Sequence, residues 1–283
     1  MELRVKKFII KKELTSLIFM TLLMIFAVLN FCHTLPFIKR VNLSEVENLN
    51  DVKDIVNKIE TTTTDNILGK YTFVEGYGLW NLFLNKKEID GFSHIKDENG
   101  FLHYSDFWNY TNNDINKIVN NVLELRDKAA ETGTEVVVLM PPVKDDVSEV
   151  NYEKGLPYCD KDWVADVYLK KLEENGINVM DFRKTLSESD LLYADKFYVT
   201  DHHWTTKASF YCFQKFVLQM NEWYDLDLDP QGIYTNIDNY NVLLYRNSTL
   251  GSHGRDTGIV YSGGLDDFTL IYPKYYTSFN YKW

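Results

Sequence analysis

Apolar residues form one long run near the N-terminus. The run Leu17–Phe31 is interrupted only by Thr21 and Asn30, and with its flanks it covers residues 15–35. An α-helix needs about 20 such residues to cross a bilayer. Four basic residues come just before it, at Lys6, Lys7, Lys11 and Lys12. Because lysines stay on the cytoplasmic side, the pattern predicts a cytoplasmic tail at 1–14, a single-pass anchor at 15–35 and an exported remainder in the cell envelope.

Two other interpretations of this run are weaker. A cleaved signal peptide needs a small-x-small cleavage site, and the segment 30–33, Asn-Phe-Cys-His, offers none. A buried helix of a soluble protein does not call for a cluster of flanking lysines. An uncleaved membrane anchor is therefore favoured.

A second helical pattern follows the anchor. Apolar residues recur at helical spacing between Leu49 and Ile59, after a possible capping box at Ser44–Glu47. The polar run Thr61–Asp65 resembles a linker, although a core-packing helix would give the same pattern. Residues 36–66 are thus predicted to be a stalk helix and linker, and 67–283 to be one domain. The aromatic segment Tyr71–Phe92 at its start is expected to be core.

Helical and strand patterns alternate through the rest of the chain. Two short strands are expected around the Asn99-Gly100 turn. Longer elements are predicted at 115–132 (helix), 135–140 (strand), 161–175 (helix), 177–182 (strand) and 204–220 (helix). A helix between two buried strands implies a right-handed crossover and a parallel sheet, so the fold class is α/β. In such folds ligands bind at loops that follow the strands, such as the loop after Tyr198-Val199.

Composition narrows the classes of function. An apolar fraction of 45% and an aromatic fraction of 15% indicate a folded body. Without residues 1–40 the chain has 23 basic and 39 acidic side chains, a balance that disfavours binding to nucleic acid. Beyond the anchor only Cys159 and Cys212 remain, either as a disulfide or as two free thiols, and no Cys/His spacing typical of zinc is present.

The candidate chemistry lies at 197–210, FYVTDHHWTTKASF. A carboxylate can hold one nitrogen of an imidazole while the other nitrogen takes or gives a proton, which makes Asp201 and His203 a candidate acid/base pair. Asp-His-His also begins the signature of manganese-dependent phosphoesterases, with Asp201, His202, His203 and His253 as conceivable ligands. That class needs further aspartate motifs near its N-terminus, where this chain has its apolar run, so metal catalysis ranks lower. A third alternative is that the histidines only cap the helix that follows.

The segment Thr200–Thr205, TDHHWT, resembles the signature of the DHHW family of exported bacterial proteins. That family is similar to the SGNH-hydrolase-like acyltransferases that O-acetylate extracellular polysaccharides such as alginate. Further segments resemble the family in the same order: the anchor, 44–48, 99–102, 138–141, Leu156-Pro157, Gly251-Ser252 and 266–269. The resemblance implies a flavodoxin-like, SGNH-like α/β/α sandwich with a mostly parallel sheet. It also implies a Ser-His-Asp site in which Asp201 is the orienting acid, His203 the base and His202 the intervening residue.

The chain departs from the family at the nucleophile. The family's serine is expected in an Asp-Ser turn on a later strand, and no Asp-Ser pair occurs in the sequence. Truncation at the C-terminus is therefore expected. Among the serines that follow the motif, Ser252 in Gly251-Ser252-His253-Gly254 is the best placed, but no buried strand precedes it to form a nucleophile elbow.

Together with the anchor, the resemblance implies an envelope-anchored protein related to O-acyl transfer or ester hydrolysis on cell-envelope polysaccharide, through Asp201, His203 and a serine that this chain does not supply, with no cofactor and no metal. Its expected partners are an extracellular polysaccharide or cell-wall glycan, the membrane, and a membrane protein that donates the acyl group. The alternative is a catalytically inactive module that binds a glycan or a protein with the same cleft.

Overall fold

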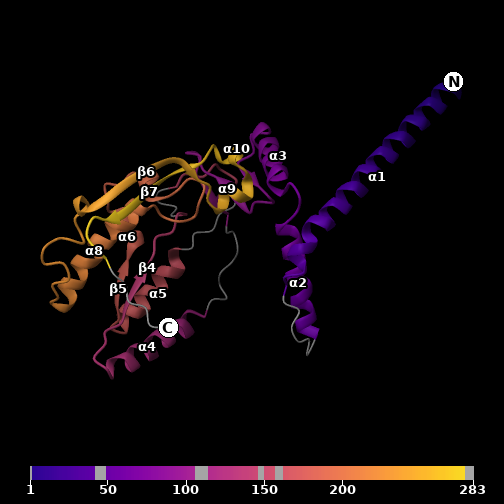
Figure 1. Cartoon of the computed structure of the whole chain (residues 1–283). Coiled ribbons are helices and arrows are strands. Elements are labelled where there is room, and N and C mark those ends of the chain that lie inside the picture. The colour runs from indigo at the N-terminus through magenta and orange to yellow at the C-terminus, as the bar shows by residue number, and fades with distance from the viewer. Residues whose placement is uncertain (1, 42–48, 106–113, 146–149, 157–161, 278–283) are drawn as a thin grey trace. The chain divides into compact units, whose positions relative to one another are not determined.

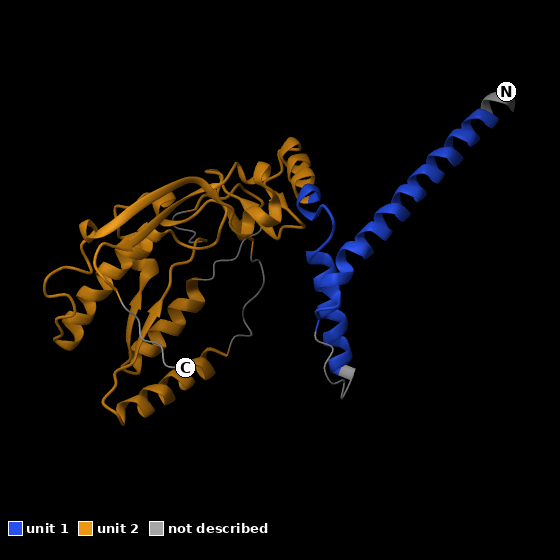
Figure 2. Ribbon diagram, viewed as in Figure 1, with its two compact units in different colours: residues 1–73 blue, residues 74–283 orange. Residues whose placement is uncertain are grey.

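The computed structural model describes residues 2–41, 49–105, 114–145, 150–156 and 162–277 (Figure 1). The chain divides into two compact units, residues 1–73 and 74–283 (Figure 2). The division falls within helix α3, Lys70–Phe83. Each unit is described by itself below.

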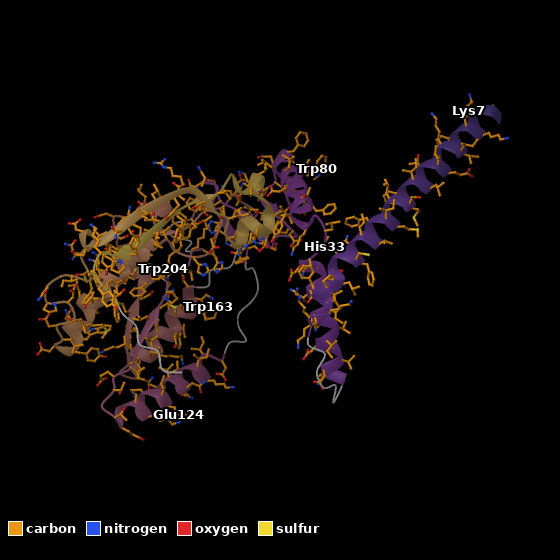
Figure 3. All side chains as sticks on the ribbon, in the orientation of Figure 1. Lys7, His33, Trp80, Glu124, Trp163 and Trp204 are labelled. Atoms are coloured by element: carbon orange, nitrogen blue, oxygen red, sulfur yellow. The ribbon has the colours of Figure 1, made fainter. Side chains whose placement is uncertain are left out.

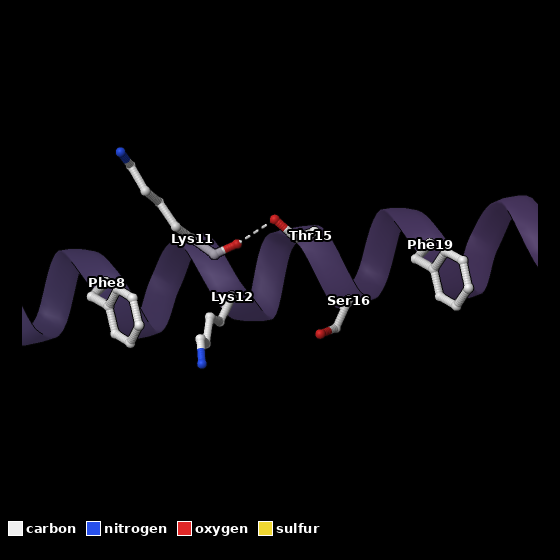
Figure 4. Close-up of a pocket in the computed structure, with 6 residues that line it drawn as sticks. All are labelled: Phe8, Lys11, Lys12, Thr15, Ser16 and Phe19. Carbon is white, nitrogen blue, oxygen red and sulfur yellow. Dashed lines mark hydrogen bonds between the residues drawn. The ribbon is translucent and has the colours of Figure 1, made fainter. Parts of the chain in front are cut away.

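The first unit contains helices α1 (Glu2–Ile38) and α2 (Leu49–Asp65). The stretch Lys6–Ile38 of α1 is long and apolar enough to cross a membrane, with a mean hydropathy of 2.2. At its basic start the six side chains drawn in Figure 4 all belong to α1, so no second element of the described chain encloses a ligand there. The Lys12 ammonium lies 4.8 Å from the centre of the Phe8 ring.

Helix α2 differs from its prediction at the C-terminal end. It runs through the polar segment Thr61–Asp65, which is therefore not a linker outside the helix. The Thr63 hydroxyl donates a hydrogen bond of 2.7 Å to the Ile59 carbonyl, so the threonine adds a bond within the helical turn. The proposed capping box at 44–47 lies outside the described residues.

The centre of the second unit is a pair of parallel strands, β4 (Val137–Met140) and β5 (Asn178–Asp181). Helices α4 (Ile115–Ala130) and α5 (Asp162–Glu174) come before and between them, as the alternating pattern predicted. A core cluster of Val119, Leu172 and Ile177 packs against Val138 and Val179. The strands are half-buried, whereas the continuous apolar run predicted burial on both faces; the Leu139 side chain is 41% exposed.

The other described sheets are antiparallel, so the sheets are small and more mixed than the expected parallel sheet. Strands β1 (Glu88–Ile89), β2 (His94–Lys96) and β3 (Leu102–Tyr104) form the first, and β2 and β3 confirm the predicted hairpin. The Asp97 carboxylate accepts the Asn99 and Phe101 N–H groups across its turn. Strands β6 (Tyr240–Thr249) and β7 (Asp266–Pro273) form the second, which the sequence patterns had not predicted.

Helix α8 (Thr206–Tyr224) confirms the third predicted helix. Its N-cap is Thr205, whose hydroxyl accepts the Ala208 N–H at 3.1 Å. The buried positions of α8 are Ala208, Cys212, Val217 and Met220, whereas Phe210 and Phe216 are partly buried and Phe213 is exposed. Before it lie the short helices α6 (Phe182–Ser187) and α7 (Tyr193–Lys196).

The prediction of a strand at Tyr198-Val199 is wrong. A single antiparallel bridge joins Phe197 to Trp204, and the residues between them form a tight loop. A 3-10 turn, Ile237–Asn239, comes directly before β6. Two short helices, α9 (Ser252–Thr257) and α10 (Ile259–Ser262), lie between β6 and β7.

Cys212 is a free thiol buried in the helix, and Cys159 lies outside the described residues. Burial raises the pKa of Cys212 to about 12.

Candidate active site

The loop Val199–Trp204 is fixed first by a remote carboxylate. Asp266, the first residue of β7, accepts hydrogen bonds from the N–H groups of Val199 (2.7 Å) and Thr200 (2.8 Å). It also accepts the Thr200 hydroxyl at 2.6 Å. Both side chains are buried, so these charge-assisted bonds form away from water and hold the loop firmly.

A buried ammonium group holds the same loop from the other side. Nζ of Lys144 donates to the carbonyls of Val199 (3.0 Å) and Asp201 (2.8 Å). The side chain is 2% exposed, and burial lowers the pKa of Lys144 to about 7 despite the carboxylates nearby. The Tyr193 hydroxyl donates to the Lys144 carbonyl at 2.5 Å, which fixes this backbone in turn.

The third support is the start of α9. The Gly251 N–H donates to Thr200 Oγ1 (2.8 Å) and the Gly254 N–H to the Thr200 carbonyl (3.0 Å). A Cβ atom at Gly251 would overlap Asp201 Cβ and the Thr200 carbonyl oxygen. Only glycine permits this close approach, which explains why the two segments that resemble the family, around 201 and 251, are found together in space.

Asp201 and His203 form the expected pair. His203 Nδ1 lies 2.5 Å from Asp201 Oδ1, and the His203 N–H donates to the same oxygen at 2.9 Å. The Ser252 N–H donates to Asp201 Oδ2 at 2.9 Å. Burial raises the pKa of Asp201, but these N–H donors and the His203 ring outweigh it and lower the pKa from 3.8 to about 2.

An ionised Asp201 fixes the tautomer of His203. The Nδ1–H group points at the carboxylate, so the lone pair lies on Nε2. The His203 side chain is 66% exposed, and no described residue hydrogen-bonds its Nε2. The pair is therefore arranged to accept a proton from a hydroxyl group that approaches from outside the loop.

Ser252 lies in this site but contacts the other histidine. Its Oγ is 2.9 Å from His202 Nδ1. Asp201 Oδ1 also lies on the side of this nitrogen, 3.7 Å from His202 Nδ1. The carboxylate therefore does not hold the other ring nitrogen, Nε2, of His202. The arrangement differs from a Ser-His-Asp triad, in which serine and acid bind different nitrogens of one imidazole.

Buried histidines surround this loop, and the sequence patterns had given them little weight. The His253 ring is 1% exposed, with no hydrogen-bond partner at either nitrogen among the described residues. Its ring centre lies 4.4 Å from Tyr104, 5.3 Å from His94 and 6.0 Å from His202. Burial, together with Lys144 and the other histidines, lowers the pKa of His253 to about 2, so this imidazole is neutral.

His103 is also buried, between two carboxylates. Its Nδ1 is 2.8 Å from Asp145 and its Nε2 is 3.1 Å from Asp97. The ring therefore ties the β2–β3 turn to the segment after β4. Both of its ring nitrogens face a carboxylate, so His103 is a core histidine whose polar atoms are satisfied.

A metal would find three ligand atoms here. One ligand atom each from Asp201, His202 and His203 lies within 4.8 Å of the others. A cation bound through Nδ1 of His203 would have to break the 2.5 Å bond to Asp201, and through Nδ1 of His202 the bond to Ser252. His253, the fourth ligand considered from sequence, is a separate buried ring.

Sequence reasoning missed Lys144, Thr200 and Asp266 as supports of the loop. Asp266 lies in a segment that resembles the family, which gave a signal of importance but none of its role. Lys144 follows Pro141-Pro142-Val143 in a polar run, where a buried lysine leaves no pattern.

Comparison with known proteins gives the fold a family context. Residues 98–215, which include this loop, match the model of the SGNH hydrolase-like domain of acetyltransferase AlgX. No match is found among curated proteins. Among solved structures, Bacillus cereus PatB1 is similar with a TM-score of 0.50 at 15% identity, over 64% of this chain and 58% of that one.

Two further structures are similar at lower TM-scores. The O-acetyltransferase domain of Pseudomonas putida AlgJ matches with a TM-score of 0.45 at 15% identity, over 64% of this chain and 66% of that one. A DHHW family protein of Eubacterium siraeum matches with a TM-score of 0.42 at 14% identity, over 67% and 57%. The chain thus spans less than two thirds of PatB1. The expected SGNH-like α/β fold and the resemblance to SGNH-hydrolase-like acetyltransferases are confirmed.

Proposed function

We propose that this chain is a membrane-anchored, extracytoplasmic protein of O-acyl transfer to, or ester hydrolysis on, a cell-envelope polysaccharide. Asp201 is the orienting acid and His203 the general base. The observation that carries the proposal is the 2.5 Å contact of Asp201 with His203 Nδ1, which leaves Nε2 open to an incoming group. The match of residues 98–215 to the acetyltransferase-type domain supports the reaction class.

The chemistry follows from the pair. Nε2 of His203 takes the proton of a hydroxyl nucleophile as its oxygen attacks the ester carbonyl carbon, and the imidazolium that forms is stabilised by the Asp201 carboxylate. The same Nε2–H then gives the proton to the leaving alkoxide as the acyl–oxygen bond breaks. The hydroxyl can belong to a serine, to a sugar or to water. Ser252 is not assigned this role, because its hydroxyl is bonded to His202.

The anchor belongs to the same proposal. Helix α1 crosses the membrane with Lys6, Lys7, Lys11 and Lys12 on the cytoplasmic side, which places the second unit outside. A glycan of the envelope is the proposed acceptor, and a membrane protein that donates acyl groups is the proposed partner.

A second function is favoured by one observation. The Ser252 hydroxyl pairs with His202 and not with His203, so no serine among the described residues is hydrogen-bonded to the proposed base, and this favours a binding module for glycan or protein. A metal-dependent phosphoesterase ranks below both, because Nδ1 of His203 is hydrogen-bonded to Asp201 and Nδ1 of His202 to Ser252.

The test is ester turnover by the full chain in detergent micelles. With p-nitrophenyl acetate, and with an acetylated glycan as a second substrate, His203→Ala should lower kcat/KM by about 10²–10⁴-fold. Ser252→Ala should change kcat/KM little. His202→Ala is the matched control, since it removes the histidine next to His203. Absence of wild-type turnover together with retained glycan binding would refute catalysis in favour of the binding module. Turnover of a phosphodiester that requires added manganese would refute both.

A further inference from the structure

One side of helix α3 carries large uncharged side chains that no described residue of the second unit covers. Tyr77, Trp80, Phe83 and Leu84 are 48%, 59%, 77% and 47% exposed, and we call these four residues the aromatic face. Their spacing of three and four places them along one side of the helix and its C-terminal turn. The sequence patterns had predicted this segment to be core, which is wrong for these positions. Figure 3 labels Trp80 on α3.

The opposite side of α3 is locked to the second unit, which fixes the direction of the aromatic face. The Glu75 carboxylate accepts the N–H groups of Ile259 (2.6 Å) and Val260 (3.2 Å) at the start of α10. Gly78 lies against the backbone of Thr257, where a Cβ atom would overlap the carbonyl oxygen. Asn81 is 2% exposed. The helix therefore cannot rotate about its axis to bury its aromatic rings.

The composition of the face matches the interface of a bilayer. No charged side chain occurs between Gly76 and Leu84. Tyrosine and tryptophan, with an apolar ring and a polar atom, concentrate at the level of the lipid headgroups. The chain beyond residue 40 is strongly acidic, with 23 basic and 39 acidic residues, so attraction to anionic lipid does not explain such a face. Burial of the apolar surface of these side chains in the bilayer does explain it.

The first unit brings the beginning of α3 to the end of the apolar run. Every side chain from Lys6 to Leu29 is exposed, and Asn30 is the first that is partly covered. Its Oδ1 accepts the Leu68 N–H at 2.7 Å, and the Phe73 ring lies edge-on to Phe26 at 5.8 Å. Residues 68–73 thus lie beside Phe26 and Asn30, which belong to the C-terminal half of the predicted anchor at 15–35.

We propose that the aromatic face of α3 lies in the interfacial layer of the membrane that α1 spans, and so binds lipid. This inference rests on the proposed membrane anchor. The face is a second point of attachment, which limits the rotation and tilt of the second unit relative to the bilayer in a way that a single tether cannot.

Quenching of tryptophan fluorescence by lipid tests the inference in the full chain. The protein is reconstituted into phosphatidylcholine vesicles whose acyl chains carry bromine near the headgroup end, and compared with unbrominated vesicles. Trp80→Phe should remove most of the lipid-dependent quenching while it keeps an aromatic ring on the face. The matched control is Trp163→Phe, on α5 and 45% exposed, which should leave the quenching unchanged. The quenching should also persist in high salt, because an apolar contact is not screened.

Equal quenching in wild type and Trp80→Phe would overturn the inference and assign the face to a protein partner instead. The anchor is tested separately, by flotation of the vesicles after extraction with alkaline carbonate. A chain that floats but shows no quenching from Trp80 overturns only the inference about α3. A chain that does not float overturns the anchor and the inference together.

Discussion

Replacement of Asp266 by alanine should destabilise the second unit and disorder the loop that holds His203. The change removes the acceptor of two backbone N–H groups, at Val199 and Thr200, and of the Thr200 hydroxyl. Each buried donor without a partner costs about 1–3 kcal/mol, so the two N–H groups together should cost about 2–6 kcal/mol. That is a large share of the ~5–15 kcal/mol by which a typical domain is stable.

The neighbouring residue provides the control. Asp267 is exposed and accepts one N–H, from Asn247, on the surface. Asp267→Ala should therefore cost less than about 1 kcal/mol. Asp266→Asn should fall between the two, because its amide keeps one oxygen as acceptor.

Denaturant unfolding of the full chain in detergent, followed by tryptophan fluorescence, measures the difference. Trp204 lies at the end of the loop, so its emission reports the loop directly. If Asp266→Ala and Asp267→Ala unfold within 1 kcal/mol of each other, the idea that the remote carboxylate supports the loop is refuted.

Three further outcomes follow from the geometry. Gly251→Ala should lower the free energy of unfolding by about 1–3 kcal/mol, because the added Cβ overlaps Asp201 and Thr200. Gly76→Ala in α3, where no atom lies near the added Cβ, should raise it by up to about 1 kcal/mol. Equal melting temperatures of the two variants would contradict this. Burial lowers the pKa of Lys144 from 10.5 to about 7, so between these two pH values the unfolded state binds more protons than the folded state. The free energy of unfolding should therefore rise by about 5 kcal/mol across this pH range in the wild type, and this rise should be absent in Lys144→Met. Parallel curves of stability against pH for the two proteins would count against this. Cys212 is buried and its pKa is raised to about 12, so its thiol should react with N-ethylmaleimide at pH 8 only after the protein unfolds. Peptide mass spectrometry measures this labelling. Rapid labelling of Cys212 in the native protein would disprove the prediction.

Local patterns predicted the elements that local contacts build. The helices at α4, α5 and α8 and the hairpin around Gly100 follow from apolar spacing, caps and a turn glycine. The Asp201–His203 contact joins residues two apart, so a tight loop is sufficient to form it. The pair could therefore be predicted from the sequence, because its contact is local.

Contacts between distant segments were not accessible. Lys144 and Asp266 reach the loop across 55 or more residues, and no periodicity reports such a contact. Helix α3 has large apolar residues on several sides, so the sequence could not tell which side would be covered. Its exposure was decided by Glu75 and Gly78, which select the face that packs on α9 and α10.

The bond between Thr200 and Asp266 also has a consequence for the order of assembly. Its partners are separated by 66 residues, so it forms only after a long segment of chain has closed into a loop. During synthesis, Asp201 and His203 therefore emerge well before the carboxylate that orders their backbone. We expect the acid/base pair to mature late in folding, when β7 docks, and proteolysis of the nascent chain should cut within 199–204 until residue 266 has been released.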